Sequence, residues 1–334
     1  LMQYHHLGLD DNPAHLDRAR RVLEEGLLRR PDAPRLLSAR AWLEMYTYDV
    51  ARARETLRPV LSGGAAGGTD FKLMSFLCLM QGDIGGAEGW LQRAFDLDPL
   101  DVNAGMNRMR IRSLAGPAGE LEADLEAMRG LYPPPLLLDV VSGWERLGRG
   151  DPAGAVRIYE RSYRREPARL ILEFLMMSEF QAGDYAAALR HRAELQASNP
   201  YLLEGYMLAA FCHGRLGQPA ERAAALRDGG RYAALWRRHI DNRTLRLFEA
   251  YFQAAAGEFP GGPDDLVRID TAAAETLARY LQAAALAHLG RPEALAAAPD
   301  PYSQVYWITL LARAEKDSFS RLARAEAGPV RSGR

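Results

Sequence analysis

The chain has 334 residues, of which 48% are hydrophobic and 25% are charged, and its formal net charge is −1. This balance gives no bulk attraction to nucleic acid or to an acidic membrane surface. No apolar run approaches the roughly 18 residues of a membrane-spanning helix, and no signal peptide is visible. We therefore expect a packed cytoplasmic protein that binds neither nucleic acid nor membrane directly.

A marker residue recurs along the chain at a period of 33 or 34 residues, with one longer step of 40 before Gly257. The markers are Ala14, Tyr48, Gly82, Gly116, Gly150, Gly183, Gly217, Gly257 and Gly290. A small residue stands five positions after five of them, at Ala19, Ala53, Ala87, Ala155 and Ala188. A proline stands 17 positions after five of them, at Pro31, Pro99, Pro133, Pro167 and Pro200. A period of this length is typical of solenoids built from pairs of helices.

Each recurring residue has a physical reason to stand where it does. A glycine closes the first helix of a hairpin because it adopts a positive φ without strain, which we expect of Gly150 and Gly183. The small residue lets the two helices approach closely. The proline ends the second helix because the residue before a proline is disfavoured in the helical region. The sequence therefore predicts a series of helical hairpins.

In chain order, residues 1–30 are expected to hold a short first helix and then a helix over PAHLDRARRVLEEGLLRR. The next hairpin is expected over residues 34–61, with its turn at Tyr48-Asp49, and a glycine-rich loop follows at Ser62–Thr69. Hairpins with turns near the later glycines come next. An insertion at residues 228–243 breaks the period, and a second loop is expected at Phe259–Pro263. Further helices are predicted over 271–289 and 302–316, and residues 327–334 read as a disordered tail. The chain shows no convincing alternation with the period of a β-strand.

The pattern resembles the tetratricopeptide repeat (TPR) family, whose units are helical hairpins with a period of about 34 residues. The resemblance is strong over Gly82–Pro99 (GDIGGAEGWLQRAFDLDP) and weaker at Gly116 and after Gly217. It implies an all-α right-handed superhelical solenoid of about eight to nine TPR-like hairpins over residues 1–326. The opening stretch, YHHLGLDDNPAHLDRARRVLEEGLLRRPDAP, also resembles the C-terminal TPR regions of bacterial transcription regulators and nucleotide cyclases.

Motifs that would carry catalysis or bind a cofactor are missing from the sequence. It has no phosphate-binding glycine loop followed by lysine, no H-E-x-x-H, no G-x-S-x-G and no paired-cysteine motif. The histidines are scattered, which disfavours a metal site. Arginine clusters such as Arg161, Arg164 and Arg165 alternate with Glu160 and Glu166, and this favours a solvated helix face over nucleic-acid binding. We predict no enzymatic activity, no cofactor and no metal.

One set of side chains gives a candidate partner-binding surface, which we call the inner stripe. Its members stand six positions before successive markers: Trp42, Phe76, Arg110, Trp144, Met177, Phe211 and Tyr251. First helices line the concave surface in the family that the chain resembles, so the stripe would form an aromatic groove there. The alternative is that the stripe belongs to the core between repeats, as aromatic residues at helical spacing usually do. The cationic residues with which TPR modules clamp a peptide carboxylate have no match beyond Lys72.

The leading functional hypothesis is a protein–protein interaction scaffold that serves as a regulatory module of a larger bacterial protein and binds a protein or peptide. One alternative is a small-molecule sensor that encloses an apolar ligand within the superhelix. Another is an envelope scaffold for polymer export, which should carry a signal peptide or a lipidated cysteine. The apolar residues at the start of the chain, including Leu1, Met2, Leu7 and Leu9, also predict a weakly held homodimer.

Overall fold

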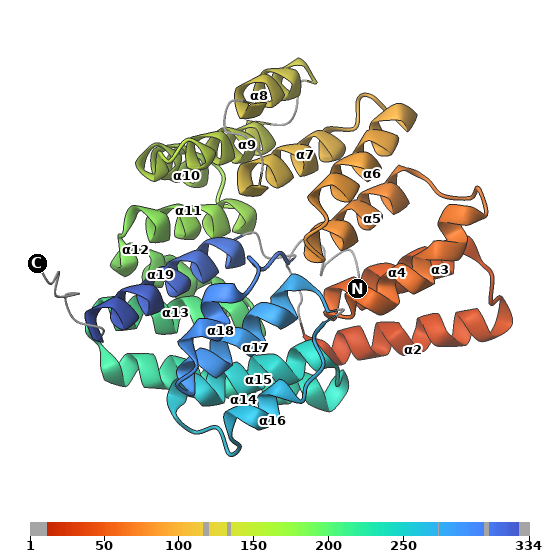
Figure 1. The fold of residues 1–334 in the computed structure, drawn as a ribbon. Helices are drawn as coiled ribbons and strands as arrows, with labels where there is room; N and C mark the ends of the chain where they lie inside the picture. The colour runs from red at the N-terminus through yellow and green to blue at the C-terminus, as the bar shows by residue number, and fades with distance from the viewer. Residues whose placement is uncertain (1–11, 116–119, 132–134, 273, 304–306, 327–334) are drawn as a thin grey trace, which may run out of the picture.

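The computed structural model describes residues 12–115, 120–131, 135–272, 274–303 and 307–326. Four sequence-based predictions fall outside these ranges. They are the short first helix and apolar residues within 1–11, the turn at Gly116, the proline stop at Pro133 and the tail at 327–334. All regular structure within the described ranges is helical (Figure 1).

The helices follow one another in antiparallel pairs, which confirms the predicted all-α solenoid of TPR-like hairpins. Eight hairpins run from α3–α4 to α17–α18, with α2 before them and α19 after them. The bounds are α2 Pro13–Arg29, α3 Pro34–Tyr46, α4 Val50–Ser62, α5 Gly68–Met80, α6 Ile84–Leu97, α7 Val102–Ala115, α8 Glu120–Gly130, α9 Pro135–Gly148, α10 Pro152–Arg165, α11 Arg169–Ala182, α12 Tyr185–Ser198, α13 Leu203–Arg215, α14 Pro219–His239, α15 Arg243–Ala256, α16 Pro263–Val267, α17 Thr276–His288, α18 Pro292–Ala297 and α19 Ile308–Glu326.

Seven of the nine marker residues lie at turns between paired helices, and each has a positive φ. They are Tyr48, Gly82, Gly150, Gly183, Gly217, Gly257 and Gly290. Ala14 is the exception, because α2 already begins at Pro13, where Asn12 caps it by accepting the Ala14 amide at 3.0 Å. The marker at Ala14 therefore lies inside a helix and not at a turn, whereas the helix expected over PAHLDRARRVLEEGLLRR is confirmed as α2.

Local side chains set where the second helices begin and end. An aspartate that follows the marker accepts an amide hydrogen bond from the first turn of α4, α6, α10 and α12, and these caps are Asp49, Asp83, Asp151 and Asp184. Helices α2, α6, α10 and α12 each end two residues before the predicted prolines. The small residues Ala53, Ala87, Ala155 and Ala188 are fully buried, as close helix approach requires.

The irregular segments differ in detail from the sequence-based predictions. The glycine-rich loop is shorter than expected, since Ser62 ends α4 and Gly68 begins α5. The period break at 228–243 is largely helical, because it extends α14 to 21 residues. A short helix, α16, follows the loop that begins at Phe259, and α17 begins at Thr276 rather than near 271.

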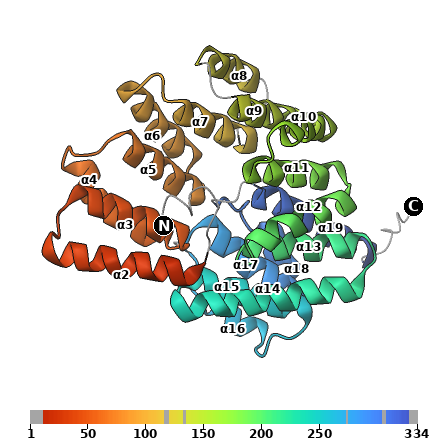
Figure 2. The ribbon, with the colours of Figure 1, turned by 180° about the vertical axis from the view of Figure 1, so that it is seen from behind.

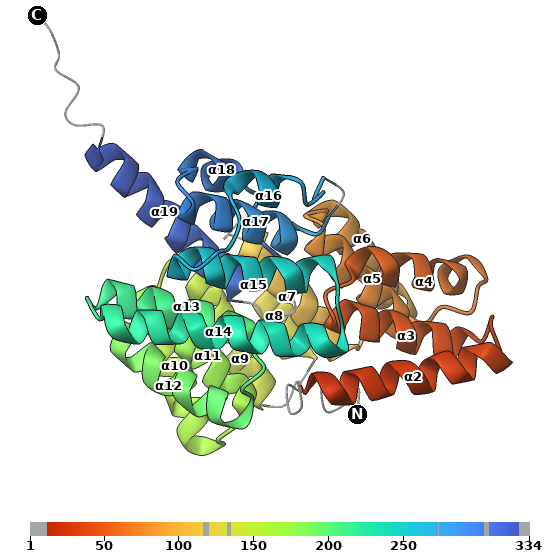
Figure 3. The ribbon, with the colours of Figure 1, turned by 90° about the horizontal axis from the view of Figure 1, so that it is seen from below.

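The solenoid closes on itself after six hairpins. Seen from the front and from behind, α3–α13 form an arc, and α17–α19 project inside it (Figures 1 and 2). From below, α16–α18 lie on the opposite side of the molecule from α2 (Figure 3). Four side-chain hydrogen bonds to main-chain carbonyls join helices that are twelve elements apart, α2 with α14, α3 with α15, α5 with α17 and α7 with α19. They run from Arg20 to His239, from Asn242 to Thr47, from Thr276 to Met80 and from Arg313 to Leu114.

Candidate interaction surface

The inner stripe lies on the first helices of seven successive hairpins, one residue on each from α3 to α15. The structure divides these residues into two groups. Trp144, Met177 and Tyr251 are 3%, 0% and 4% exposed, so their side chains lie in the core. The other four, Trp42, Phe76, Arg110 and Phe211, are half-buried. A binding role for the stripe stays a prediction, and its accessible part is smaller than the sequence indicates.

Three of the half-buried residues form one continuous cluster on α3, α5 and α7. The rings of Trp42 and Phe76 meet edge to face with their centroids 6.4 Å apart. The guanidinium carbon of Arg110 lies 5.2 Å from the centroid of Phe76. Aromatic rings that hold an arginine in this way restrict its orientation and leave its other N–H groups available as donors.

Arg110 uses such a donor to bind an irregular segment of the same chain. Its Nη2 donates to the main-chain carbonyl of Ser303 at 2.7 Å. Ser303 belongs to residues 299–303, which have no regular secondary structure and connect α18 towards α19. The Tyr302 amide donates to Thr276 Oγ1 at 2.9 Å, and the Tyr302 ring packs between the two hydrophobic cores. The inner surface of α7 thus already holds a stretch of polypeptide by its backbone.

The remaining members of the stripe have separate surroundings. Trp144 meets Phe174 edge to face at 5.3 Å in the core between α9 and α11. Phe211 packs against Phe180 at 5.5 Å and against Tyr185 at 6.3 Å, which places it in an aromatic cluster of α11, α12 and α13. These residues support the stacking of hairpins and do not continue the Trp42 cluster.

Tyr251 takes part in a buried polar cluster that no sequence pattern predicts. Its hydroxyl donates to Glu315 Oε1 of α19 at 3.1 Å, and the Tyr280 hydroxyl donates to the other carboxylate oxygen. His288 Nε2 lies 3.3 Å from Glu315 Oε1, and its ring packs against Tyr251 and Phe319. The cluster fastens α19 to α15 and α17. No local motif marks Glu315, since its partners are 27 to 64 residues away.

The pKa values in this cluster follow from burial and hydrogen bonding. Burial, and then the charge of Glu315, raise the pKa of both tyrosines, so their hydroxyls remain donors. Burial also acts to raise the pKa of Glu315, but hydrogen bonds from His288 and the tyrosines outweigh it and keep that pKa below its ordinary value. A charged carboxylate with several donors is the arrangement that a buried acid requires.

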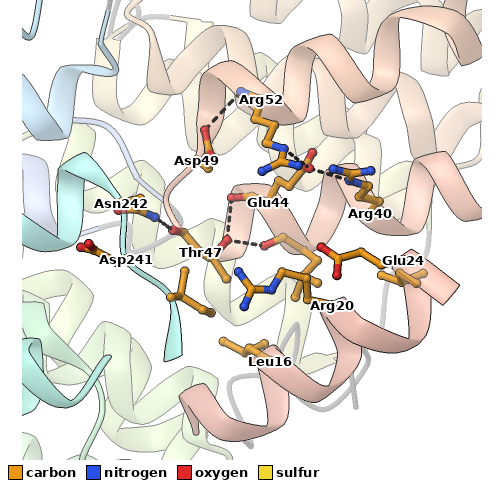
Figure 4. A pocket seen from close by; sticks show the side chains of 13 residues that line it. Leu16, Arg20, Glu24, Arg40, Glu44, Thr47, Asp49, Arg52, Asp241 and Asn242 are labelled. Atoms are coloured by element: carbon orange, nitrogen blue, oxygen red, sulfur yellow. Dashed lines mark hydrogen bonds and ion pairs between the residues drawn. The ribbon is translucent and has the colours of Figure 1, made fainter. Parts of the chain in front are cut away.

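A small cavity lies where α2 and α3 meet the connection between α14 and α15 (Figure 4). Charged side chains line much of it, and Glu44 Oε1 there accepts from Arg40 at 2.8 Å and lies 3.1 Å from Arg52 Nε. Its volume is about 90 Å³, whereas pockets for small organic ligands measure roughly 300–1,000 Å³. The cavity is therefore smaller than such a pocket, and it lies at the closure of the superhelix.

Across the described residues, histidine, cysteine and acidic side chains nowhere gather in a group of three or more that could hold a metal ion. None of the helices that the structure describes combines the length and hydrophobicity needed to cross a bilayer.

Comparison with solved structures identifies the fold. No family model matches the chain, and no curated protein matches its sequence. A chain of the APC/C hetero-tetramer Cut9–Hcn1 aligns over 72% of this chain and 48% of its own length, with 12% identity and a TM-score of 0.50. The type IV pilus biogenesis factor PilW aligns over 61% of this chain and 92% of its own length, with 16% identity and a TM-score of 0.42. The C-terminal part of a TPR repeat-containing protein from Cytophaga hutchinsonii aligns over 72% of this chain and 100% of its own length, with 13% identity and a TM-score of 0.37.

At these identities the similarity concerns the fold alone. The fold assignment rests on the Cut9–Hcn1 match, which has a TM-score of 0.50. Together with the hairpins of about 34 residues and their positive-φ turns, it shows that the chain has the tetratricopeptide-repeat fold.

Proposed function

We propose that the chain is a protein–protein interaction scaffold whose inner surface, formed by Trp42, Phe76 and Arg110, binds an extended segment of a protein partner. The observation that carries this proposal is the hydrogen bond from Arg110 to the Ser303 carbonyl. A side chain that recognises a main-chain carbonyl accepts any extended segment of suitable shape. The neighbouring aromatic rings then select segments with an apolar side chain.

Residues 299–303, which already occupy the site at Arg110, would regulate access of a partner to the scaffold. A partner that binds at Arg110 must displace residues 299–303, and these are continuous with α19, whose Arg313 donates to Leu114 at the end of α7. Partner binding is thereby coupled to the position of the C-terminal helix. The resemblance of the opening stretch to regions of bacterial transcription regulators and nucleotide cyclases supports a regulatory module that acts in the cytoplasm of a bacterium.

Photo-crosslinking tests the proposal. Phe76 is replaced by benzoylphenylalanine in the complete protein, which is expressed and irradiated in cells of its own source. The matched control carries the same probe at Leu97 of α6, which is 59% exposed. We expect a specific adduct with a second polypeptide from position 76 and not from position 97.

The crosslinked partner is then purified and its affinity measured. Trp42→Ala should weaken binding by about 2 kcal/mol or more, as truncation of a central aromatic residue does, and Leu97→Ala should leave it unchanged. Adducts formed solely with residues 299–303 would refute the proposal, as would equal affinities of the Trp42 and Leu97 variants.

A further inference from the structure

A second groove lies on the opposite side of α5 from the inner stripe. Met74 forms its floor and Phe76 belongs to the stripe, and two positions along a helix correspond to about 200° of rotation. We call this the outer groove. It is lined by Arg54, Arg58, Leu61 and Ser62 of α4, Met74 of α5 and Trp90 of α6, and its volume is about 410 Å³.

Neighbouring side chains hold the apolar wall of the outer groove in place. Phe71 packs against Trp90 with ring centroids 5.7 Å apart, and the Arg93 guanidinium carbon lies 4.4 Å from the centre of the Trp90 ring. Trp90 is half-buried and Met74 is buried. The indole therefore presents a fixed apolar surface to the groove, suited to a large apolar side chain.

The charged wall carries one sign of charge. The six lining residues include two guanidinium groups and no carboxylate. Arg54 donates to Gln81, a neutral partner, and Arg58 is exposed with no ion pair to any residue that the structure describes. Glu55 stands beside them on α4 but does not line the groove. Planar guanidinium groups bind carboxylates through two parallel hydrogen bonds, so this wall is complementary to an acidic partner.

We propose that the outer groove binds an acidic protein segment. A large apolar side chain of the segment packs between Met74 and Trp90, and a neighbouring aspartate or glutamate is received by Arg54 and Arg58. This site is independent of the one proposed on the inner surface, because α5 separates the two. A partner can occupy the outer groove while residues 299–303 remain on Arg110.

The test uses the complete chain and a displayed library of random dodecapeptides, which favours no composition in advance. Peptides are selected on the wild-type protein and sorted by their loss of binding to Trp90→Ala or to Trp42→Ala. We expect a class that depends on Trp90 and not on Trp42, in which aspartate and glutamate flank Leu, Phe or Trp. A class that depends on Trp42 alone reports on the inner surface, so the two proposals succeed or fail separately.

A charge reversal at the rim provides the second measurement, since Arg58 is exposed and its replacement leaves the core intact. Arg58→Glu should weaken binding of the Trp90-dependent peptides at least tenfold, and their affinity should fall as salt is raised. Arg161→Glu, the same change at an exposed position of α10, is the matched control and should have little effect. The proposal is overturned if no peptides depend on Trp90, if those that do are basic or uncharged, or if both charge reversals act alike.

Discussion

Replacing Tyr48 with glycine tests how strongly the closure of the superhelix stabilises the fold. Tyr48 has a φ of 62°, and six other hairpin turns have a glycine with positive φ at the equivalent marker position. Its ring is 5% exposed and packs against Trp236 at 6.2 Å and Phe248 at 5.5 Å. Its hydroxyl donates to Glu204 Oε1 at 3.2 Å. A tyrosine at a glycine position thus joins α3 and α4 to α13, α14 and α15.

Two effects of opposite sign decide the outcome. Glycine relieves the strain of a left-handed residue, which is worth about 1–2 kcal/mol. Loss of a buried aromatic side chain costs about 3–5 kcal/mol, because packing is lost and a cavity remains. The difference predicts that Tyr48→Gly lowers the free energy of unfolding by about 1–4 kcal/mol.

Urea unfolding followed by circular dichroism measures the change, and amide exchange shows where it acts. The matched control is Gly150→Ala, because Gly150 has a φ of 74° and an added Cβ would meet no atom within 4 Å. That variant reports the backbone strain alone, about 1–2 kcal/mol. Faster exchange in α14 and α15 of the Tyr48 variant would locate its effect at the closure. A Tyr48→Gly protein as stable as the wild type would refute the reasoning.

Four other predictions need only standard measurements. Gly183→Val should lower the free energy of unfolding by about 1 kcal/mol or more, because φ is 81° there; an unchanged melting temperature would contradict this. Trp144→Ala should cost about 3–5 kcal/mol in denaturant titration, since the ring is buried. Burial raises the pKa of Cys78 to about 11 and of Cys212 to about 12, so neither native thiol should react with iodoacetamide at neutral pH until the protein is unfolded. The lowered pKa of Glu315 means that its stabilising contribution is complete above about pH 4.5 and is lost as the pH falls, so amide exchange in α19 should rise before that in α9.

The hairpins could be predicted from the sequence because their determinants are local. A glycine with positive φ, an aspartate cap and a proline stop each act within one or two turns of helix. The 34-residue period predicts the turn at Tyr48, although a tyrosine is not a typical turn residue. The same period places a turn at Ala14, but Asn12 and Pro13 begin a helix there. At the end of the repeat array, the local helix cap therefore decides the structure and the repeat period does not.

The inner stripe was harder to predict because its exposure depends on distant parts of the chain. The positions on first helices are correct, but Tyr251 is covered by Glu315 of α19 and Arg110 by Ser303. Those contacts span 64 and 193 residues. They follow from the small rotation that each hairpin adds to the superhelix, and this rotation has no signature in any short stretch of sequence.

The closure also completes the helices that it joins. The last carbonyls of a helix have no partner within the helix and need donors from elsewhere. Asn242, Thr276 and Arg313 donate to carbonyls in the last turn, or at the cap, of α3, α5 and α7. Side chains at α15, α17 and α19 therefore cap the C-terminal ends of α3, α5 and α7. Under the function proposed above, a partner that displaces residues 299–303 must replace the contacts of this segment with Arg110 and Thr276. The inner surface should therefore stay closed until a segment with better contacts binds.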